Sequence, residues 1–400
     1  MSRFLFVVPP LVGHTNPTVS VARHLASRGH DVAWVAHPGK VRPLLPAGAR
    51  LFALPEQVDA DHARAVGARA KTARGAAALK FLWEDFLVPL ARQMQPGIAA
   101  AVDEFRPDVL AVDQQAVAGG LVARRSGLPW ATLATTSAGV IDPLAALPAV
   151  KQWHRELIAE LERDAGLLPA DHAEISPHLV LAFTTEALCR GTFPAHYRFV
   201  GPSISDRPET TPFPFEQLRR PSVLVSMGTV NAEASGRFYE VTMAALRDEP
   251  VQVVLVAPPE LAPDPPASFV VRAYVPQLAL LEHVDAVVCH GGHNTTCEAL
   301  AHGLPLVIAP IKDDQPIVAD QVVAAGAGLR VKFGRVQPGE LRDAVRRVRT
   351  EASFREAAAR VRASFAAAGG ADAAARALEA LAEVRSTAAR EAHLRNERSE

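Results

Sequence analysis

Short apolar runs alternate with helix-like segments along most of this 400-residue chain. Residues 3–8, 31–36 and 109–112 are apolar runs of strand length, and residues 17–28 and 117–126 have helical character. Apolar strands that alternate with helices are typical of a parallel sheet with helices on both faces. The chain is therefore predicted to have an α/β fold built from doubly wound sheets.

The alternation stops once and starts again, which predicts two domains. Residues 202–214 are rich in proline, serine and threonine, and clustered prolines favour a semi-rigid linker. Strand-like runs resume at residue 222. The predicted segments are a first domain over 1–205, a linker over 206–217, a second domain over 218–384 whose last helix can return to the first, and a charged tail over 385–400.

Charge and cysteine content exclude several classes of protein. The formal net charge is −1, from 42 basic and 43 acidic side chains, so nothing in the composition attracts nucleic acid or an anionic membrane. Three cysteines without a CxxC pair indicate neither a disulfide framework nor a zinc site. The N-terminal apolar run is too short for a signal peptide, and no run reaches the roughly eighteen apolar residues of a membrane span. We expect a cytoplasmic protein without membrane insertion.

The segment from His290 to Glu298 lies between a strand-like run and a helix-like run, with two glycines at the turn. Glycines let the backbone approach an anion, and the first N–H groups of a helix lack internal partners and carry the positive end of the macrodipole. Histidine, asparagine and threonine side chains add donors. The pattern predicts a site for a nucleotide diphosphate. An ordinary structural turn is the alternative, because many turns share this pattern.

Two further blocks accompany this motif, Tyr274–Gln277 before it and residues 303–316 after it. The three blocks, in this order and spacing, resemble the donor-binding signature of family-one glycosyltransferases. That group includes plant natural-product glucosyltransferases and bacterial macrolide glycosyltransferases, and the resemblance spans the whole chain. It implies the GT-B fold, in which two doubly wound domains face each other across a cleft, and it implies a nucleotide-sugar donor.

The resemblance assigns the diphosphate to two loops of the second domain. One loop follows the strand-like run 222–226, and an ordinary strand-to-helix turn is its alternative. The other loop is the glycine turn described above. The matching positions are Ser226, Gly228 and Thr229 in the first loop and His290, Gly292, Asn294 and Thr295 in the second.

The resemblance implies that the nucleoside is held by Tyr274, Val275 and Gln277. It also implies that Gln277 and Glu298 contact the ribose. The family usually has tryptophan at the Tyr274 position, where it stacks on uracil. Tyrosine can still stack with a smaller face, which leaves the choice between uracil and thymine open.

Asp314 and Gln315 match the family's contacts to sugar hydroxyls. Their alternative is a cap for a helix over residues 317–325, because such residues commonly start helices. His293 belongs to the donor-side set, although any contact that it makes to the sugar is left open.

His14 and Asp113 are the candidate catalytic residues. Each follows a predicted strand, so both lie at the carboxyl edge of the first sheet, where open α/β folds bind ligands. The resemblance implies that His14 is the general base and that Asp113 orients its ring. The alternatives are a structural hydrogen bond for His14 and, for Asp113, the N-cap of the helix that starts near Gln115.

Phe81, Trp83 and Phe86 cluster in the long helical region 56–104 and are a candidate acceptor pocket for a small apolar molecule. Packing of that helix on the core is the alternative. No metal site is expected, because Asp313 and Asp314 are adjacent and one metal ion is not easily held by both. A helix dipole and side-chain donors would neutralise the leaving group instead.

The sequence therefore predicts an inverting, metal-independent glycosyltransferase that moves a hexose from a UDP- or dTDP-sugar to a hydroxyl of a small apolar natural product. It needs no other cofactor, and a homodimer is left open. A dehydrogenase is a poor alternative, since no GxGxxG follows the first strand. A non-catalytic glycosyltransferase-like helper is the second alternative, and it should have lost the base or the phosphate motif.

Overall fold

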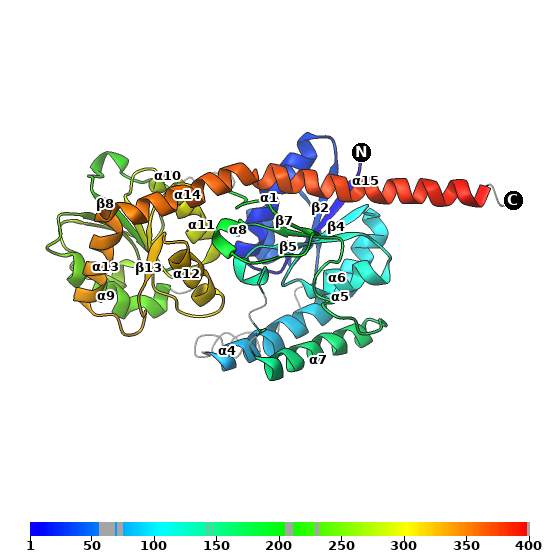
Figure 1. The fold of residues 1–400 in the computed structure, drawn as a ribbon, viewed down its shortest axis with the longest axis horizontal. Helices are drawn as coiled ribbons and strands as arrows, with labels where there is room; N and C mark the ends of the chain where they lie inside the picture. Colours follow the sequence, from blue (N-terminus) through cyan, green and yellow to red (C-terminus); the bar gives the residue numbers. More distant parts are fainter. Residues whose placement is uncertain are drawn as a thin grey trace. The chain divides into compact units, whose positions relative to one another are not determined.

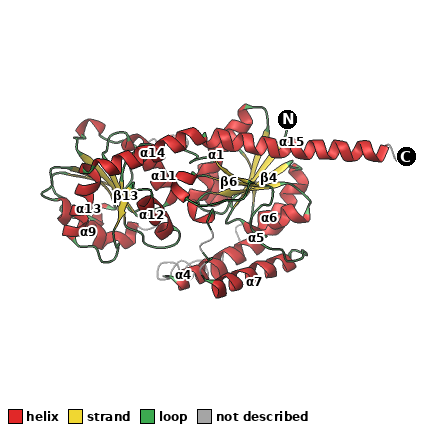
Figure 2. Ribbon diagram, in the orientation of Figure 1, coloured by secondary structure: helices red, strands yellow, loops and turns green. Residues whose placement is uncertain are grey.

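The computed structural model describes residues 1–55, 69, 75–141, 144–145, 147–204, 211–228 and 232–397, without the side chains of residues 76, 232–233 and 385–397. The chain divides into two compact units. The first comprises Met1–Phe183, Gly191–Ser205 and Ala368–Glu400, and the second comprises Thr184–Arg190 and Asp206–Ala367. In each unit helices flank a sheet on both sides (Figure 2). Both units are doubly wound α/β folds, as the alternation predicts.

The described part of the first unit holds a seven-stranded sheet in the order β3-β2-β1-β4-β5-β6-β7, with every neighbouring pair parallel. Its strand order reverses direction between β1 and β4, which places the topological switch point there. The strands are β1 (Arg3–Val7), β2 (Asp31–Ala36), β3 (Arg50–Ala53), β4 (Val109–Asp113), β5 (Trp130–Ala134), β6 (Leu179–Ala182) and β7 (Tyr197–Phe199).

Alternate side chains of β1 face two different cores, as the period of a strand requires. Leu5 and Val7 join one buried cluster with residues of α5 and α6. Phe4 and Phe6 join another with residues of α1 and α15. The helical elements are α1 (Val12–Ser27), α2 (Pro38–Val41), η1 (Arg42–Leu44), α4 (Ala76–Lys80), the π-helix η2 (Phe81–Leu87), α5 (Val88–Phe105), α6 (Val117–Arg125), η3 (Ser137–Gly139), α7 (Pro148–Asp164) and α15 (Gly370–Glu397).

Helix α1 begins earlier than its sequence predicts. The helical pattern indicated a start at Pro17, but the helix starts at Val12 and includes Pro17. The Leu11 carbonyl accepts hydrogen bonds from the backbone nitrogens of His14 (3.2 Å) and Thr15 (3.1 Å), which closes the first turn. His14 consequently lies in the first turn of a helix, where its backbone is held, rather than in a loop.

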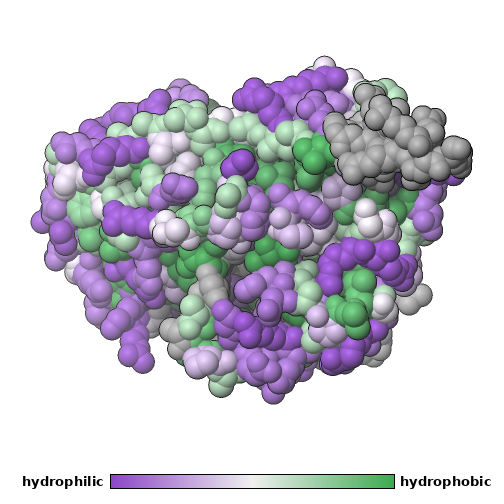
Figure 3. All heavy atoms as spheres, turned by 45° about the vertical axis from the view of Figure 1, so that its right-hand side comes forward, coloured by the Kyte–Doolittle hydropathy of each residue, from purple (hydrophilic) through white to green (hydrophobic). Residues whose placement is uncertain are grey.

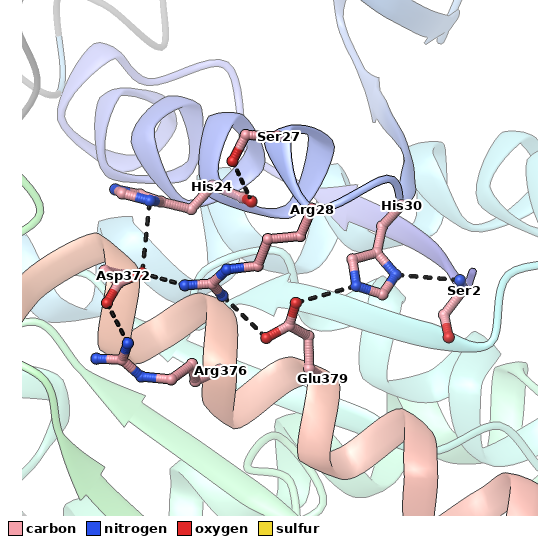
Figure 4. Close-up of polar contacts among 8 residues, drawn as sticks. All are labelled: Ser2, His24, Ser27, Arg28, His30, Asp372, Arg376 and Glu379. Carbon is pink, nitrogen blue, oxygen red and sulfur yellow. Dashed lines mark hydrogen bonds and ion pairs between the residues drawn. The ribbon is translucent and has the colours of Figure 1, made fainter.

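Helix α15 packs beside α1 within the first unit (Figure 1). Arg28 pairs with Asp372 and with Glu379, whose Oε2 lies 2.9 Å from Nη1 of Arg28 (Figure 4). Nε2 of His30 lies 3.0 Å from Oε1 of the same glutamate. Residues 368–384, which the sequence placed in the second domain with a possible return of the last helix, thus belong to the first unit.

The described part of the second unit holds a six-stranded sheet in the order β10-β9-β8-β11-β12-β13, again parallel throughout. Its switch point lies between β8 and β11. The strands are β8 (Ser222–Ser226), β9 (Gln252–Val256), β10 (Phe269–Arg272), β11 (Ala286–Cys289), β12 (Leu306–Ile308) and β13 (Gly328–Arg330). The helical elements are α8 (Glu186–Cys189), η4 (Phe215–Gln217), η5 (Ala232–Ser235), α9 (Gly236–Leu246), η6 (Pro259–Leu261), α10 (Gln277–Leu281), α11 (His293–Ala301), α12 (Gln315–Ala324), α13 (Pro338–Thr350) and α14 (Ala352–Ala368).

Hydrophilic side chains are spread over the face of the molecule drawn in Figure 3, with apolar ones between them. Within the part of the chain that the structure describes, no helix is long and apolar enough to cross a membrane.

Candidate active site

Two candidate catalytic side chains meet at the switch point of the first sheet. Strands β1 and β4 are neighbours there, with Val7 opposite Val112. The chain leaves β1 toward α1, which carries His14 in its first turn, and β4 ends at Asp113. Loops that leave adjacent strands in different directions open a crevice at such a point, where open α/β folds bind ligands.

The imidazole of His14 contacts the carboxylate of Asp113. Nδ1 of His14 lies 2.9 Å from Oδ1 and 3.0 Å from Oδ2. The side chain of Asp113 is fully buried, whereas that of His14 is 16% exposed. A buried carboxylate on Nδ1 orients the ring and stabilises the charge that an imidazolium would carry.

The N-cap alternative for Asp113 is wrong, because α6 starts at Val117 and its N-cap is Ala116. The carboxylate does, however, stabilise the turn that follows β4, since Oδ1 accepts from the backbone nitrogen of Gln115 at 2.8 Å. Asp113 therefore has a structural contact and a contact to His14 at the same time.

Thr135 is a further polar residue of this site that the sequence analysis missed. Its hydroxyl oxygen lies 2.7 Å from Oδ2 of Asp113 and 2.8 Å from Nδ1 of His14. It follows β5, the neighbour of β4, so its position directly after an apolar strand was the signal that could have identified it.

Glycines dominate the switch point of the second sheet. The imidazole of His290, which follows β11, lies against Gly228, which follows β8, and against Gly292. A Cβ atom at Gly228 would come within 2.7 Å of that ring, and one at Gly292 within 2.5 Å. Gly228 and Gly291 also have φ angles of +74° and +88°, which favour glycine. Both positions therefore require glycine while the ring of His290 keeps this place.

His290 carries an unsatisfied polar atom. Its Nδ1 is buried and has no hydrogen-bond partner among the described residues. Burial lowers the pKa of the ring, while the charge of Asp314 and the backbone of Ser226 oppose that shift. Buried polar atoms normally have a hydrogen-bond partner, so this nitrogen is a candidate contact for a bound ligand.

Helix α11 starts at His293, with Gly292 as its N-cap. Asn294 and Thr295, both partly exposed, therefore lie in its first turn with His293. His293 is only 7% exposed, and its Nε2 lies 3.5 Å from Sγ of Cys297. This ring packs against the buried Cys297, and its donor-side role stays a prediction.

Cys289 and Cys297 lie in the apolar core of the second unit. Burial raises the pKa of the Cys289 thiol to about 11. Ser226, at the end of β8, is 6% exposed, and Thr229 lies outside the described residues.

The candidate nucleoside residues differ in exposure. Tyr274 is 67% exposed, whereas Val275 packs against the core of the unit. Nε2 of Gln277 donates to Oε2 of Glu298 at 2.5 Å, so these two predicted ribose contacts are hydrogen-bonded to each other. Glu298 is almost completely buried.

The candidate sugar residues lie at the start of α12. Asp314 is its N-cap residue and Gln315 its first residue, but the Asp314 side chain forms no cap hydrogen bond, so the capping alternative is wrong for that carboxylate. Oε1 of Gln315 accepts from the backbone nitrogens of Ile311 (2.8 Å) and Lys312 (3.1 Å). These two hydrogen bonds hold the loop, and Nε2 of Gln315 is the side-chain atom left to contact a ligand.

The candidate acceptor residues lie on the π-helix η2. Trp83 and Phe86 are partly buried and pack against the core of the first unit, as their alternative interpretation expects, whereas Phe81 is not part of that cluster. Among the described residues, no group of three His, Cys, Asp or Glu side chains is arranged to hold a metal ion.

Comparisons with known proteins identify the family. Residues 244–381 match the model described as "Erythromycin biosynthesis protein CIII-like, C-terminal domain". The 4'-demethylrebeccamycin synthase of Lentzea aerocolonigenes is 33% identical, over 92% of this chain and 96% of that protein. The chain belongs to the family-one glycosyltransferases. The NDP-glycosyltransferase YjiC of Bacillus subtilis is a further relative of this glycosyltransferase, 28% identical over 93% of the chain and 95% of the relative.

A crystal structure of the glycotransferase of kitacinnamycin matches this glycosyltransferase with a TM-score of 0.77 and 25% identity, over 95% of this chain and 99% of that one. The fold is GT-B, which confirms the predicted fold class. The prediction of a glycosyltransferase is also confirmed, and enzymes of this family use nucleotide sugars as donors. The hypothesis of an active glycosyltransferase is favoured over that of a non-catalytic helper protein.

Proposed function

We propose that this glycosyltransferase transfers a hexose, with inversion at the anomeric carbon, from a UDP- or dTDP-sugar to a hydroxyl of a small apolar natural product. The observation that carries the proposal is the contact of 2.9 Å between Nδ1 of His14 and the buried carboxylate of Asp113. A base of this kind suits the deprotonation of an alcohol, which is a poor nucleophile until its proton is removed.

On the acceptor side, Asp113 keeps the hydrogen of neutral His14 on Nδ1, so the lone pair of Nε2 takes the proton of the acceptor hydroxyl. The oxygen then attacks the anomeric carbon while the bond to the nucleotide diphosphate breaks on the opposite face. One such in-line displacement converts an α-linked donor into a β-linked product. Asp113 stabilises the imidazolium that forms.

On the donor side, the first turn of α11 offers backbone N–H groups and the hydroxyl and amide groups of Thr295 and Asn294 to the diphosphate. Gly228 and Gly292 make room for the ring of His290, and Nδ1 of that ring is a buried polar atom that would donate to a phosphate oxygen when it carries the ring hydrogen. Donors of this kind stabilise the departing charge, so we propose that the reaction needs no metal ion.

The remaining donor contacts follow from exposure and hydrogen bonding. Tyr274 has an exposed ring that can stack on the base. The bonded pair Gln277 and Glu298 would receive the ribose, and Asp314 with Nε2 of Gln315 would bind sugar hydroxyls.

The apolar acceptor is proposed from the relatives. One is named a 4'-demethylrebeccamycin synthase, and another, from Pantoea ananas, is named a zeaxanthin glucosyltransferase. Of the residues predicted to line the acceptor pocket, Phe81 remains the best candidate, because Trp83 and Phe86 pack against the core.

The test is a screen of UDP-glucose and dTDP-glucose against phenolic and macrolide acceptors, with nucleotide diphosphate release and product mass as readouts. We expect release that depends on the acceptor, a β-glycosidic product by proton NMR coupling, and the same rate in EDTA. An α-linked product would refute inversion, and loss of activity in EDTA would refute metal independence. Absence of turnover with every donor and acceptor would favour the helper alternative.

A further inference from the structure

Thr135 completes the polar group at the switch point of the first sheet. We infer that Thr135 is a positioning residue, which holds His14 in the tautomer that a base requires; this rests on the proposed function. The side chain is 3% exposed, and its hydroxyl contacts both His14 and Asp113. The three polar groups therefore form a closed triangle rather than a simple pair.

The hydrogen positions in this triangle follow from the inventory of donors. A threonine hydroxyl has one hydrogen, and the hydroxyl of Thr135 donates it to Oδ2 of Asp113 at 2.7 Å. Its oxygen then faces Nδ1 of His14, 2.8 Å away, with a lone pair. The carboxylate of Asp113 also presents only acceptors to Nδ1. Two acceptors converge on Nδ1, so Nδ1 carries the ring hydrogen and the lone pair of neutral His14 is on Nε2.

Thr135 also helps to fix the carboxylate. Asp113 accepts from the backbone nitrogen of Gln115 at 2.8 Å, from the hydroxyl of Thr135 and from Nδ1 of His14. A fully buried carboxylate with donors on both oxygens has little freedom to rotate, which holds the imidazole in one orientation. Without the hydroxyl of Thr135, Oδ2 of Asp113 would lose this hydrogen bond and keep the one from Nδ1 of His14.

The sheet explains why Thr135 reaches this position. Asp113 of β4 is opposite Leu133 of β5, and Thr135 lies two residues beyond Leu133. Side chains two residues apart face the same side of a strand. The backbone nitrogen of Thr135 bonds to the Leu133 carbonyl at 3.1 Å, which turns the chain at the strand end and keeps the hydroxyl close to Asp113.

The test compares Thr135→Val, which keeps the shape and removes the hydroxyl, with Thr135→Ser, which restores a hydroxyl. Thr132→Val is the matched control, because Thr132 is a buried threonine of β5 whose hydroxyl bonds to the backbone of Ser176 instead. We expect kcat to fall about tenfold in Thr135→Val with a small change in KM, and to recover to within about threefold in Thr135→Ser. Thr132→Val should keep wild-type kcat.

A readout without turnover separates this inference from the proposed function. In full-length protein with labelled histidines, the signal of His14 is the one that disappears in His14→Ala. In wild-type protein the nitrogen signals should show hydrogen on Nδ1. In Thr135→Val they should show a mixture of tautomers, because one of the two acceptors that face Nδ1 is gone.

Two results would overturn the inference. One is a His14 in Thr135→Val that keeps the wild-type tautomer. The other is a loss of kcat in Thr135→Val that Thr132→Val reproduces, because a general loss of packing would then explain it. Wild-type turnover by His14→Ala would refute the proposed base, and the NMR measurement would still decide the role of Thr135 in the triangle.

Discussion

The two sheets of this enzyme share the strand order around their switch points and carry different chemistry there. In the first unit the strand ends present ionisable and hydroxyl side chains, with His14 against the buried Asp113. In the second unit glycines follow the strand ends, and Gly228 and Gly292 lie against the ring of His290. Parallel strand order determines where a ligand can bind, whereas the residues that follow the strands determine which ligand it is.

The difference has a physical reason. Proton transfer needs a titratable group whose tautomer is controlled, so the first unit surrounds an imidazole with buried hydrogen-bond partners. Diphosphate binding needs backbone N–H groups that an anion can reach. In the second unit the residues directly before α11 are glycines, which have no Cβ. If this division is correct, substitutions in one unit should impair one function and leave the other intact.

The largest effect is expected for Asp113→Asn. An amide in place of the carboxylate can donate to Nδ1 of His14, which would favour the wrong tautomer and leave the imidazolium unstabilised. We expect kcat to fall about 10²- to 10⁴-fold, with unchanged binding of UDP or dTDP by calorimetry. Asp103→Asn is the control, because Asp103 is exposed on α5. A large loss of nucleotide affinity in Asp113→Asn would break the division between the units.

The reverse pattern is expected for Gly292→Ala. The added Cβ would lie 2.5 Å from Nε2 of His290, so the ring or the turn must move. A displacement that costs about 1–3 kcal/mol weakens nucleotide binding roughly 10- to 100-fold. Gly334→Ala in the same unit is the control, because its Cβ would meet nothing within 4 Å. Wild-type affinity for UDP and dTDP in Gly292→Ala would contradict a phosphate-binding turn.

A smaller effect is expected for Tyr274→Ala. Loss of a stacking ring worth about 0.5–1.5 kcal/mol should weaken nucleotide binding about 2- to 10-fold, and Tyr274→Trp should preserve it. Leu168→Ala, which changes another strongly exposed apolar side chain, is the control. Comparison of UDP with dTDP binding in the wild type, Tyr274→Ala and Tyr274→Trp would also show whether the ring discriminates between uracil and thymine. Equal affinities in Tyr274→Ala and wild type would remove Tyr274 from the site.

The smallest effect concerns stability. Burial lowers the pKa of His290 in the folded enzyme, so below about pH 6.5 the unfolded chain binds the proton more readily than the folded one. The stability contributed by neutral His290 is therefore present above that pH and decreases as the pH falls. Urea unfolding of the nucleotide-free enzyme between pH 7.5 and 5 should show a smaller acid loss in His290→Gln. Identical pH dependence would show that burial does not hold the ring neutral.

The sequence predicted most of the strands because their apolar runs are continuous. It missed β3 and β13, which lie at the edges of the two sheets. Strand β3 is only partly buried, and β13 is a three-residue strand that begins with a glycine, so neither has a long apolar run. Edge strands of this kind are specified by their pairing partner more than by their own composition.

The site was predicted less completely than the fold. The glycine turn and the His14–Asp113 pair follow from strand ends that are visible in the sequence. Thr135 was missed because register, which sequence alone does not reveal, brings it next to Asp113. His293 was placed in the donor-side set by the resemblance, with its contact to the sugar left open, and in the structure it is the first residue of α11 with its ring against Cys297.

The most direct test of the account is the turnover and nucleotide affinity of His14→Ala beside His178→Ala, which changes an exposed histidine of the same unit. The account predicts that His14→Ala loses about 10²- to 10⁴-fold in kcat while it binds UDP or dTDP as the wild-type enzyme does, and that His178→Ala is unaffected. A His14→Ala enzyme that turns over at the wild-type rate would contradict the assignment of proton transfer to the first unit.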